Sequence, residues 1–242
     1  TKLLTPAKSN AKTAKGGRDY VAAILHLAPA EVAGFGNVCP FASEGCRASC
    51  LNTSGRGQVK GDLDPAILAR YSIHRARAER TRRFFQDRAG FFAQLDAELR
   101  ALSKRAQRLG KLAVVRLNGT SDISWERFGV PQRHPEIIFY DYTKSERRAW
   151  EYGMRGASWP GNYHLTYSRS ETTPDSLVRE LLAAGVNVAA VFETLPAVAW
   201  GAPVIDGLEH DFRFEDPQGV VVGLLPKGRA KLDASGFVIR NA

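Results

Sequence analysis

The sequence predicts an α/β protein, a partial, open TIM-like barrel of about six parallel strands. Short apolar runs of strand length alternate with helical segments, which is typical of parallel sheets built from βαβ units. The runs are continuously apolar, as in strands covered on both faces. The chain has 242 residues, a length at which α/β barrels form one domain. A doubly wound sheet is the second choice.

Six apolar runs are predicted to be the strands, because each is short and continuous. They span residues 20–27, 111–117, 136–140, 162–167, 186–192 and 219–225. Beyond the last run, residues 231–239 are expected to form a terminal hairpin arm.

A long helical stretch is predicted between Asp64 and Gly110. Asp64 suits the helix cap and Pro65 fits the first turn. Apolar residues then recur at spacings typical of a helix with one face on the core. Gly90 is expected to split the stretch into two helices, and Gly110 to end it. Residues 175–185 predict a further amphipathic helix.

The net charge of +9 predicts a polyanionic partner, and nucleic acid is the common one. Residues 1–18 carry five cations and no acid, and we expect them to form a basic arm before a single α/β domain, residues 19–242. Residues 70–88 carry seven arginines against two acids. The side chains expected to contact phosphates are Lys8, Lys12, Lys15, Arg77, Arg80 and Arg83.

The sequence has no apolar run near the roughly 20 residues that a membrane span needs. It begins without the apolar core of a signal peptide. Three cysteines are a poor basis for a disulfide framework. We therefore expect a cytoplasmic protein that does not bind membranes.

All three cysteines lie within one loop after the first predicted strand, with the spacing C-x6-C-x3-C: Cys39, Cys46 and Cys50. Three thiolates are what a [4Fe–4S] cluster needs if its fourth iron is left open for a cofactor or substrate. A zinc site is the second interpretation, with His26 or His74 as the fourth ligand. Free or redox-active thiols are the third.

Polar residues follow several of the predicted strands, where ligands bind in parallel α/β folds. Such residues also serve as helix caps and rim ion pairs, which is the alternative interpretation. The candidate catalytic residues are Asp122, Asp141, Lys144 and Glu193. The candidate cofactor-binding residues are Asn118, Thr120, Ser168, Arg169 and Glu193.

Nearly the whole chain resembles the phage "gene product 88"-like family of uncharacterised proteins. The matching segments are residues 9–13, 37–40, 45–46, 50–57, 82–85, 116–122, 140–144, 227–230 and 235–237. The resemblance implies a phage, prophage or plasmid origin, and it implies no particular activity.

A strand followed by a three-cysteine loop and a partial barrel also looks like the radical S-adenosylmethionine superfamily. That resemblance implies that Cys39, Cys46 and Cys50 bind the cluster and that S-adenosylmethionine binds its open iron. The sequence departs from that family in its cysteine spacing, usually C-x3-C-x2-C. It also lacks the Gly-Gly-Glu signature and has residues 118–122 in that place.

Together these observations predict an iron–sulfur enzyme whose open iron binds S-adenosylmethionine or a substrate, and which acts on nucleic acid. The alternative is a nucleic-acid-binding phage or plasmid protein with a structural iron–sulfur or zinc site and no catalysis. Elemental analysis identifies the bound metal as iron or zinc, and salt-dependent binding tests the nucleic-acid contact.

Overall fold

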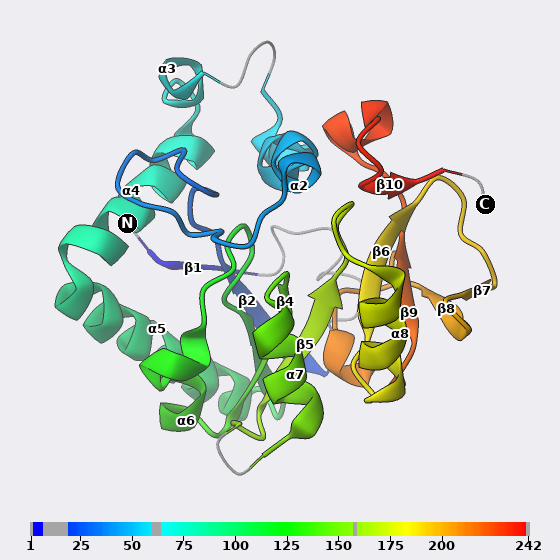
Figure 1. Ribbon diagram of the computed structural model, residues 1–242. Coiled ribbons are helices and arrows are strands. Elements are labelled where there is room, and N and C mark those ends of the chain that lie inside the picture. Colours follow the sequence, from blue (N-terminus) through cyan, green and yellow to red (C-terminus); the bar gives the residue numbers. More distant parts are fainter. Residues whose placement is uncertain (1, 7–18, 60–63, 157–158, 241–242) are drawn as a thin grey trace.

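One large, mostly parallel sheet of ten strands forms the centre of the molecule (Figure 1). The computed structural model describes residues 2–6, 19–59, 64–156 and 159–240. Along the sheet the order is β1-β2-β3-β4-β5-β6-β9-β8-β7, with β10 also paired to β6. The bounds are β1 (Leu4–Pro6), β2 (Tyr20–Leu25), β3 (Leu112–Arg116), β4 (Ile137–Thr143), β5 (Tyr163–Ser168), β6 (Val188–Phe192), β7 (Val198–Ala199), β8 (Ala202–Asp206), β9 (Val221–Leu224) and β10 (Val238–Ile239).

The six apolar runs are β2, β3, β4, β5, β6 and β9, and neighbours among them pair in parallel. The α/β class and the parallel sheet are therefore confirmed. The finer expectation of a partial barrel is not shown, because the sheet is open and no pairing among the described strands joins β1 to β7. From β2 to β6 the strands lie side by side in chain order.

The longer helices cover one face of the sheet: α5 packs on β2 and β3, α7 on β4 and β5, and α8 on β6. One-sided coverage differs from a doubly wound sheet, in which helices lie on both faces. The helices are α2 (Glu44–Ala48), α3 (Pro65–Leu68), α4 (Ser72–Gln86), α5 (Arg88–Arg108), α6 (Val130–Arg133), α7 (Glu146–Met154) and α8 (Asp175–Ala183). Short 3₁₀ helices are η2 (Leu51–Thr53), η3 (Gly55–Gly57), η4 (Trp125–Phe128), η5 (Arg213–Glu215) and η6 (Gly228–Leu232).

The other face of the sheet is covered by the segment that contains η5, which packs against β4 and β5. Phe212 and Phe214 lie against Tyr140 with ring centroids 6.1 and 5.8 Å away, and Tyr20 joins them from β2. Both faces of the central strands are therefore buried, which explains why their sequences are continuously apolar.

The long helical stretch breaks at Asp87, three residues earlier than the expected break at Gly90. The Asp87 carboxylate accepts a hydrogen bond from the Gly90 N–H at 3.1 Å and so caps α5. Gly90 therefore lies in the first turn of α5, and a Cβ at this position would clash with the capping carboxylate. Gly110, with φ of 63°, follows the end of α5 as predicted.

The expected terminal hairpin arm is wrong, because β10 pairs in parallel with β6. Val191 of β6 pairs with Leu224 of β9 and with Val238 of β10, so β10 occupies the same side of β6 as β5. On that side of β6, β5 pairs only with Val188 and Ala189, and the two strands then diverge. The tail thus lies at the carboxyl edge of the sheet, between the ends of β5 and β6.

The expected basic arm is in part a strand, since residues 4–6 form β1 and pair antiparallel with β2. The Glu98 carboxylate of α5 accepts hydrogen bonds from the N–H groups of Leu3 and Leu4 at 2.8–3.1 Å. Residues 1 and 7–18 lie outside the described residues. In the described part of the chain no helix is long and apolar enough to span a membrane.

Candidate functional site

The cysteine loop, residues 37–57, lies over the carboxyl ends of β3 and β5. The Cys39 thiol is 3.6 Å from the carbonyl oxygen of Thr120, which follows β3. Glu171, which follows β5, accepts hydrogen bonds from the Gly45 N–H at 2.7 Å and the Ser43 hydroxyl at 2.8 Å. The predicted placement of the cysteines at this edge of the sheet is therefore observed.

Ser43, Glu171 and Ser235 all contact the helix α2 inside this loop. Ser43 caps it by accepting a hydrogen bond from the Cys46 N–H at 3.2 Å. A Cβ on Gly45 would clash with the Ser235 hydroxyl and lie 2.7 Å from a Glu171 carboxylate oxygen. Glycine at this position thus allows α2 to pack against both the β5 end and the tail before β10.

The three thiols are free and partly buried. Burial raises the pKa of Cys39 to about 12, and it raises the pKa values of Cys46 and Cys50 as well. Each thiol lies within electrostatic range of another, since Cys46 and Cys50 both act on Cys39 and Cys46 acts on Cys50. Among the described residues, no three or more histidine, cysteine or carboxylate side chains form a group that could hold a metal ion.

Two partly buried cations stand beside two of these thiols. Arg77 of α4 donates to the Asn52 carbonyl at 2.8 Å, and burial lowers its pKa to about 10 while Cys50 opposes that shift. Lys144, after β4, donates to the carbonyl and hydroxyl of Ser168 at 3.0 and 3.1 Å. Burial lowers the Lys144 pKa, and the neighbouring Cys46 is the largest opposing influence.

The two histidines considered as a fourth zinc ligand have other surroundings. Both ring nitrogens of His74 have partners, the Asn52 amide at 3.4 Å and the Gly57 carbonyl at 2.9 Å. Burial, together with Arg77 and other nearby arginines, lowers the pKa of His26 to about 3.

Asn118 and Asp141 belong to an internal hydrogen-bond network. The Asn118 side-chain oxygen accepts from the N–H of Ile123 and from the indole of Trp125, both at 2.9 Å. Asp141 accepts from the Asn118 N–H at 2.6 Å and from the Tyr163 hydroxyl at 2.8 Å. Burial raises the Asp141 pKa to about 7. Both side chains hold the loop after β3 in place.

Asp122 bridges that network to α7. Its carboxylate accepts from Arg148 at 2.8 Å and from the Lys144 N–H at 2.8 Å, and burial raises its pKa. Arg148 also pairs with Glu126 at 2.9 Å and is itself 1% exposed. The structure thus places Asp122 in a buried ion-pair network, and the Asp122 N–H donates to the Val38 carbonyl of the cysteine loop at 2.8 Å.

The remaining strand-end candidates divide into two groups. Thr120 and Ser168 border the cysteine loop through Cys39 and Lys144, and Arg169 donates to the Gly236 carbonyl at 2.8 Å in the tail. Glu193 instead forms an ion pair with Arg240 at 2.6 Å, beside β10. These three candidates therefore gather around the cysteine loop together with Lys144 and Asp122, and Glu193 lies apart from them.

The arginines expected to contact phosphates donate within the protein. Arg77 binds Asn52, and Arg80 donates to the carbonyls of Lys2 and His26 at 2.8 and 3.3 Å. Arg83 contacts Gln94. Lys8, Lys12 and Lys15 lie outside the described residues.

The comparisons with known proteins decide the family. Residues 2–241 match the family model described as "Gene product 88". The chain belongs to the gene product 88 family. No curated protein and no solved structure matched it. The comparisons thus agree with the first resemblance, and none of them supports the resemblance to radical S-adenosylmethionine enzymes.

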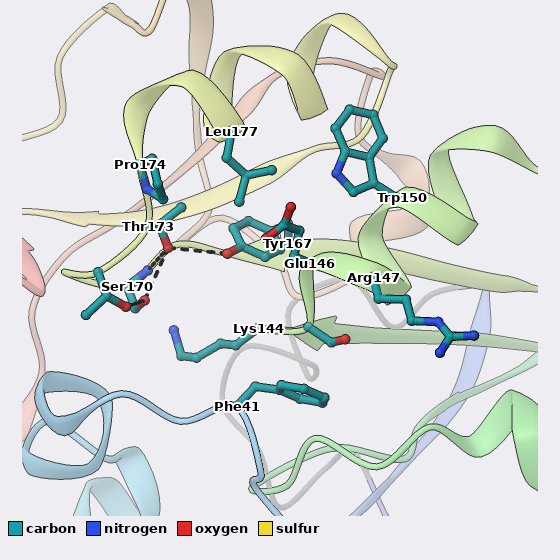
Figure 2. Close-up of a pocket in the computed structure, with 12 residues that line it drawn as sticks. Phe41, Lys144, Glu146, Arg147, Trp150, Tyr167, Ser170, Thr173, Pro174 and Leu177 are labelled. Carbon is teal, nitrogen blue, oxygen red and sulfur yellow. Dashed lines mark hydrogen bonds between the residues drawn. The ribbon is translucent and has the colours of Figure 1, made fainter.

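This gene product 88 family member also has a cavity of about 520 Å³ beside the cysteine loop (Figure 2). Its lining comes from Phe41 of the loop, Lys144, the first turn of α7 and the start of α8. In Figure 2, Phe41 lies on the opposite side of Lys144 from Tyr167 and Trp150. The hydroxyl groups of Thr173 and Tyr167, both in the cavity lining, form a hydrogen bond at 3.3 Å.

Sequence reasoning missed the aromatic residues of this cavity. Phe41 stands two positions after Cys39, which is the one signal that places it at the site. Trp150 and Tyr167 look like core residues in the sequence, because helix and strand periodicity alone does not separate a cavity wall from the packed interior.

Proposed function

We propose that this protein is an iron–sulfur enzyme in which Cys39, Cys46 and Cys50 bind a [4Fe–4S] cluster. Three cysteines leave one iron open for an exogenous ligand. The cysteine loop lies at the carboxyl edge of a parallel sheet, where ligands bind in α/β folds. A cavity of about 520 Å³ adjoins the loop and is large enough for a small-molecule substrate.

The observation that carries the proposal is the pairing of thiols with cations. Arg77 and Lys144 are partly buried, and they donate hydrogen bonds to neutral oxygens of Asn52, Ser168 and Arg169. Cys50 acts electrostatically on Arg77, and Cys46 acts on Lys144 more strongly than Asp122 and Glu171 do. Partly buried positive charges are costly unless negative charge lies close by. Thiolates bound to a cluster supply that negative charge.

The donor set fits the cluster in kind and number, and a cluster takes each thiolate on a different iron, so the three sulfurs need not converge on a single ion. All three sulfurs are free thiols, and thiolate is the ligand that iron–sulfur clusters take. The bound cluster would supply one-electron transfer and a Lewis-acidic iron. The protein's own part is to hold the loop through Ser43, Gly45 and Glu171, and to place Phe41 in the wall of the adjoining cavity.

The decisive experiment is metal analysis of protein purified without oxygen and reconstituted with iron and sulfide. We expect about four irons per chain and matching sulfide, as a [4Fe–4S] cluster requires. The Cys46→Ala variant should lose most of this iron. Phe41→Leu, in the same loop, should retain it.

The outcomes separate the alternatives. Stoichiometric zinc with no iron would replace the proposal by a structural metal site. Iron content unchanged in Cys46→Ala, or no metal at all, would refute it. Adding S-adenosylmethionine to the reduced protein tests the open iron, since a change in the electron paramagnetic resonance signal identifies it as the ligand.

A further inference from the structure

The second half of α5 carries four cations and Lys111 follows it, and within the described part of the chain the side chains of these five have no partner. Four are exposed and Lys111 is partly buried. None of the five forms an ion pair or hydrogen bond with another described side chain. This α5 cationic face consists of Arg100, Lys104, Arg105, Arg108 and Lys111.

The arrangement on α5 differs from that of cations on neighbouring helices. On α4, Arg82 pairs with Glu79 at 2.7 Å, and on α7, Arg147 pairs with Glu151 at 2.7 Å. On α5, Arg100, Lys104 and Arg108 follow at four-residue spacing, so like charges are neighbours on one side of the helix. Such pairs destabilise a helix. The chain carries that cost on α5, and there, unlike at Arg82 and Arg147, no acidic side chain pairs with the cations among the described residues.

The helix dipole accounts for only part of this charge. Arg105 and Arg108 lie in the last turn, where cations stabilise the partial negative charge of the helix end. That effect fades within one turn, so it does not account for Arg100 and Lys104. A negatively charged partner accounts for all five.

We propose that the α5 cationic face binds the phosphate backbone of duplex DNA. Successive cations at four-residue spacing are about 6 Å apart along the helix axis, which is similar to the spacing of phosphates on one strand. The large exposed apolar side chains beside them are Leu109 and Leu112, and neither is aromatic. Single strands are held largely by aromatic stacking, so this face suits backbone contacts to a duplex.

The face lies away from the cysteine loop. α5 ends immediately before β3 begins at Leu112, so its last turns are at the amino edge of the sheet. The cysteine loop, which contains α2, is at the carboxyl edge (Figure 1). Binding of DNA here is therefore independent of the proposed cluster, and either proposal can fail alone.

The test measures anisotropy of a short labelled DNA duplex with the full chain, from about 50 to about 200 mM salt. The variant is Arg100→Gln, Lys104→Gln, Arg108→Gln. The matched control is Arg179→Gln, Lys227→Gln, Lys231→Gln, which removes the same charge from other exposed positions. Losing three phosphate contacts should lower the affinity on the order of tenfold or more and reduce the slope of log K against log salt by about 2.7.

The control should keep the slope of the wild type, and Cys46→Ala should keep the wild-type affinity. Equal losses in the α5 variant and the control would show that only overall charge matters and would overturn the proposal. So would a wild-type protein that does not bind the duplex. Thermal melting checks folding, and the α5 variant should melt close to the wild type, because the loss of like-charge pairs offsets the loss of the Arg108 charge at the helix end.

Discussion

Asp141 shows how a residue that looks catalytic in the sequence serves the fold. It stands near the end of a strand, where catalytic carboxylates are common in α/β proteins. Its side chain is 0% exposed, and both oxygens accept hydrogen bonds, from Asn118 and Tyr163. Periodicity indicates the strand, but only the structure shows that α7 covers this face of it.

Stability should depend on the protonation of Asp141. Burial raises its pKa from 3.8 to about 7 in the folded protein. Between these values the folded state holds a proton that the unfolded chain has lost, so this group's contribution to stability is present at low pH and falls as pH rises. Asp141→Asn lacks that dependence. Its free energy of unfolding minus that of the wild type should increase between about pH 4 and pH 7, by on the order of a few kcal/mol.

Denaturant unfolding at several pH values measures this difference. Asp19→Asn serves as the control, because Asp19 is exposed, and its difference from the wild type should be flat. A flat curve for Asp141→Asn as well would show that the carboxyl group ionises in the folded protein as it does in water.

For single residues, the sequence predicted where a side chain lies in the sheet better than it predicted which groups that side chain contacts. The strand-end positions of Thr120, Lys144 and Ser168 did bring them to the cysteine loop. Charge alone did not show that Arg77 and Arg80 donate to internal carbonyls, because a helix position does not identify the acceptor on a distant segment. Free cations are recognised only after the internal partners are known.

At the level of elements, the capping of α5 determines where the helical stretch divides. Asp87→Ala removes the side-chain acceptor for the Gly90 N–H and should destabilise the protein by about 1 kcal/mol. Asp87→Asn keeps an acceptor there and should cost much less, since the exposed contact with Arg83 at 3.6 Å contributes little. Urea denaturation compares the two variants. Equal losses would mean that charge, and not capping, stabilises the junction.

The long parallel strands were predictable because burial on both faces makes each a continuous apolar run. β1, β7 and β10 were missed because each has only two or three residues, too few for a pattern. The position of β10 depends on the divergence of β5 from β6, a feature of the whole sheet that no local sequence records.

At the scale of the whole molecule, the early cysteine loop and the late tail meet at Glu171. Its carboxylate binds residues 43 and 45, and Ser235 lies against Gly45. The Lys144 ammonium nitrogen lies over the Phe237 ring, 5.0 Å from the ring centroid. The candidate site is thus built from segments near both ends of the described chain.

Removing residues 233–242 should therefore expose the cysteines. We expect faster reaction of their thiols with a disulfide reagent, because the tail no longer covers α2 and Lys144. The control Arg240→Gln removes the exposed ion pair with Glu193 and the hydrogen bonds of Arg240 to the Asp233 and Lys231 carbonyls. It leaves the tail residues in the chain, and it should react at the wild-type rate. Circular dichroism confirms that the truncated chain keeps its helices. An unchanged labelling rate would show that the tail does not shield the loop.

The place of β10 has a consequence for biosynthesis. A ribosome releases the cysteine loop long before it releases the strand that settles between β5 and β6. Until then, nothing from the tail rests on α2, and the thiols of the nascent chain remain accessible. If the cysteines bind the cluster proposed above, loading before β10 is inserted would meet an open site, whereas loading after its insertion would meet a covered one.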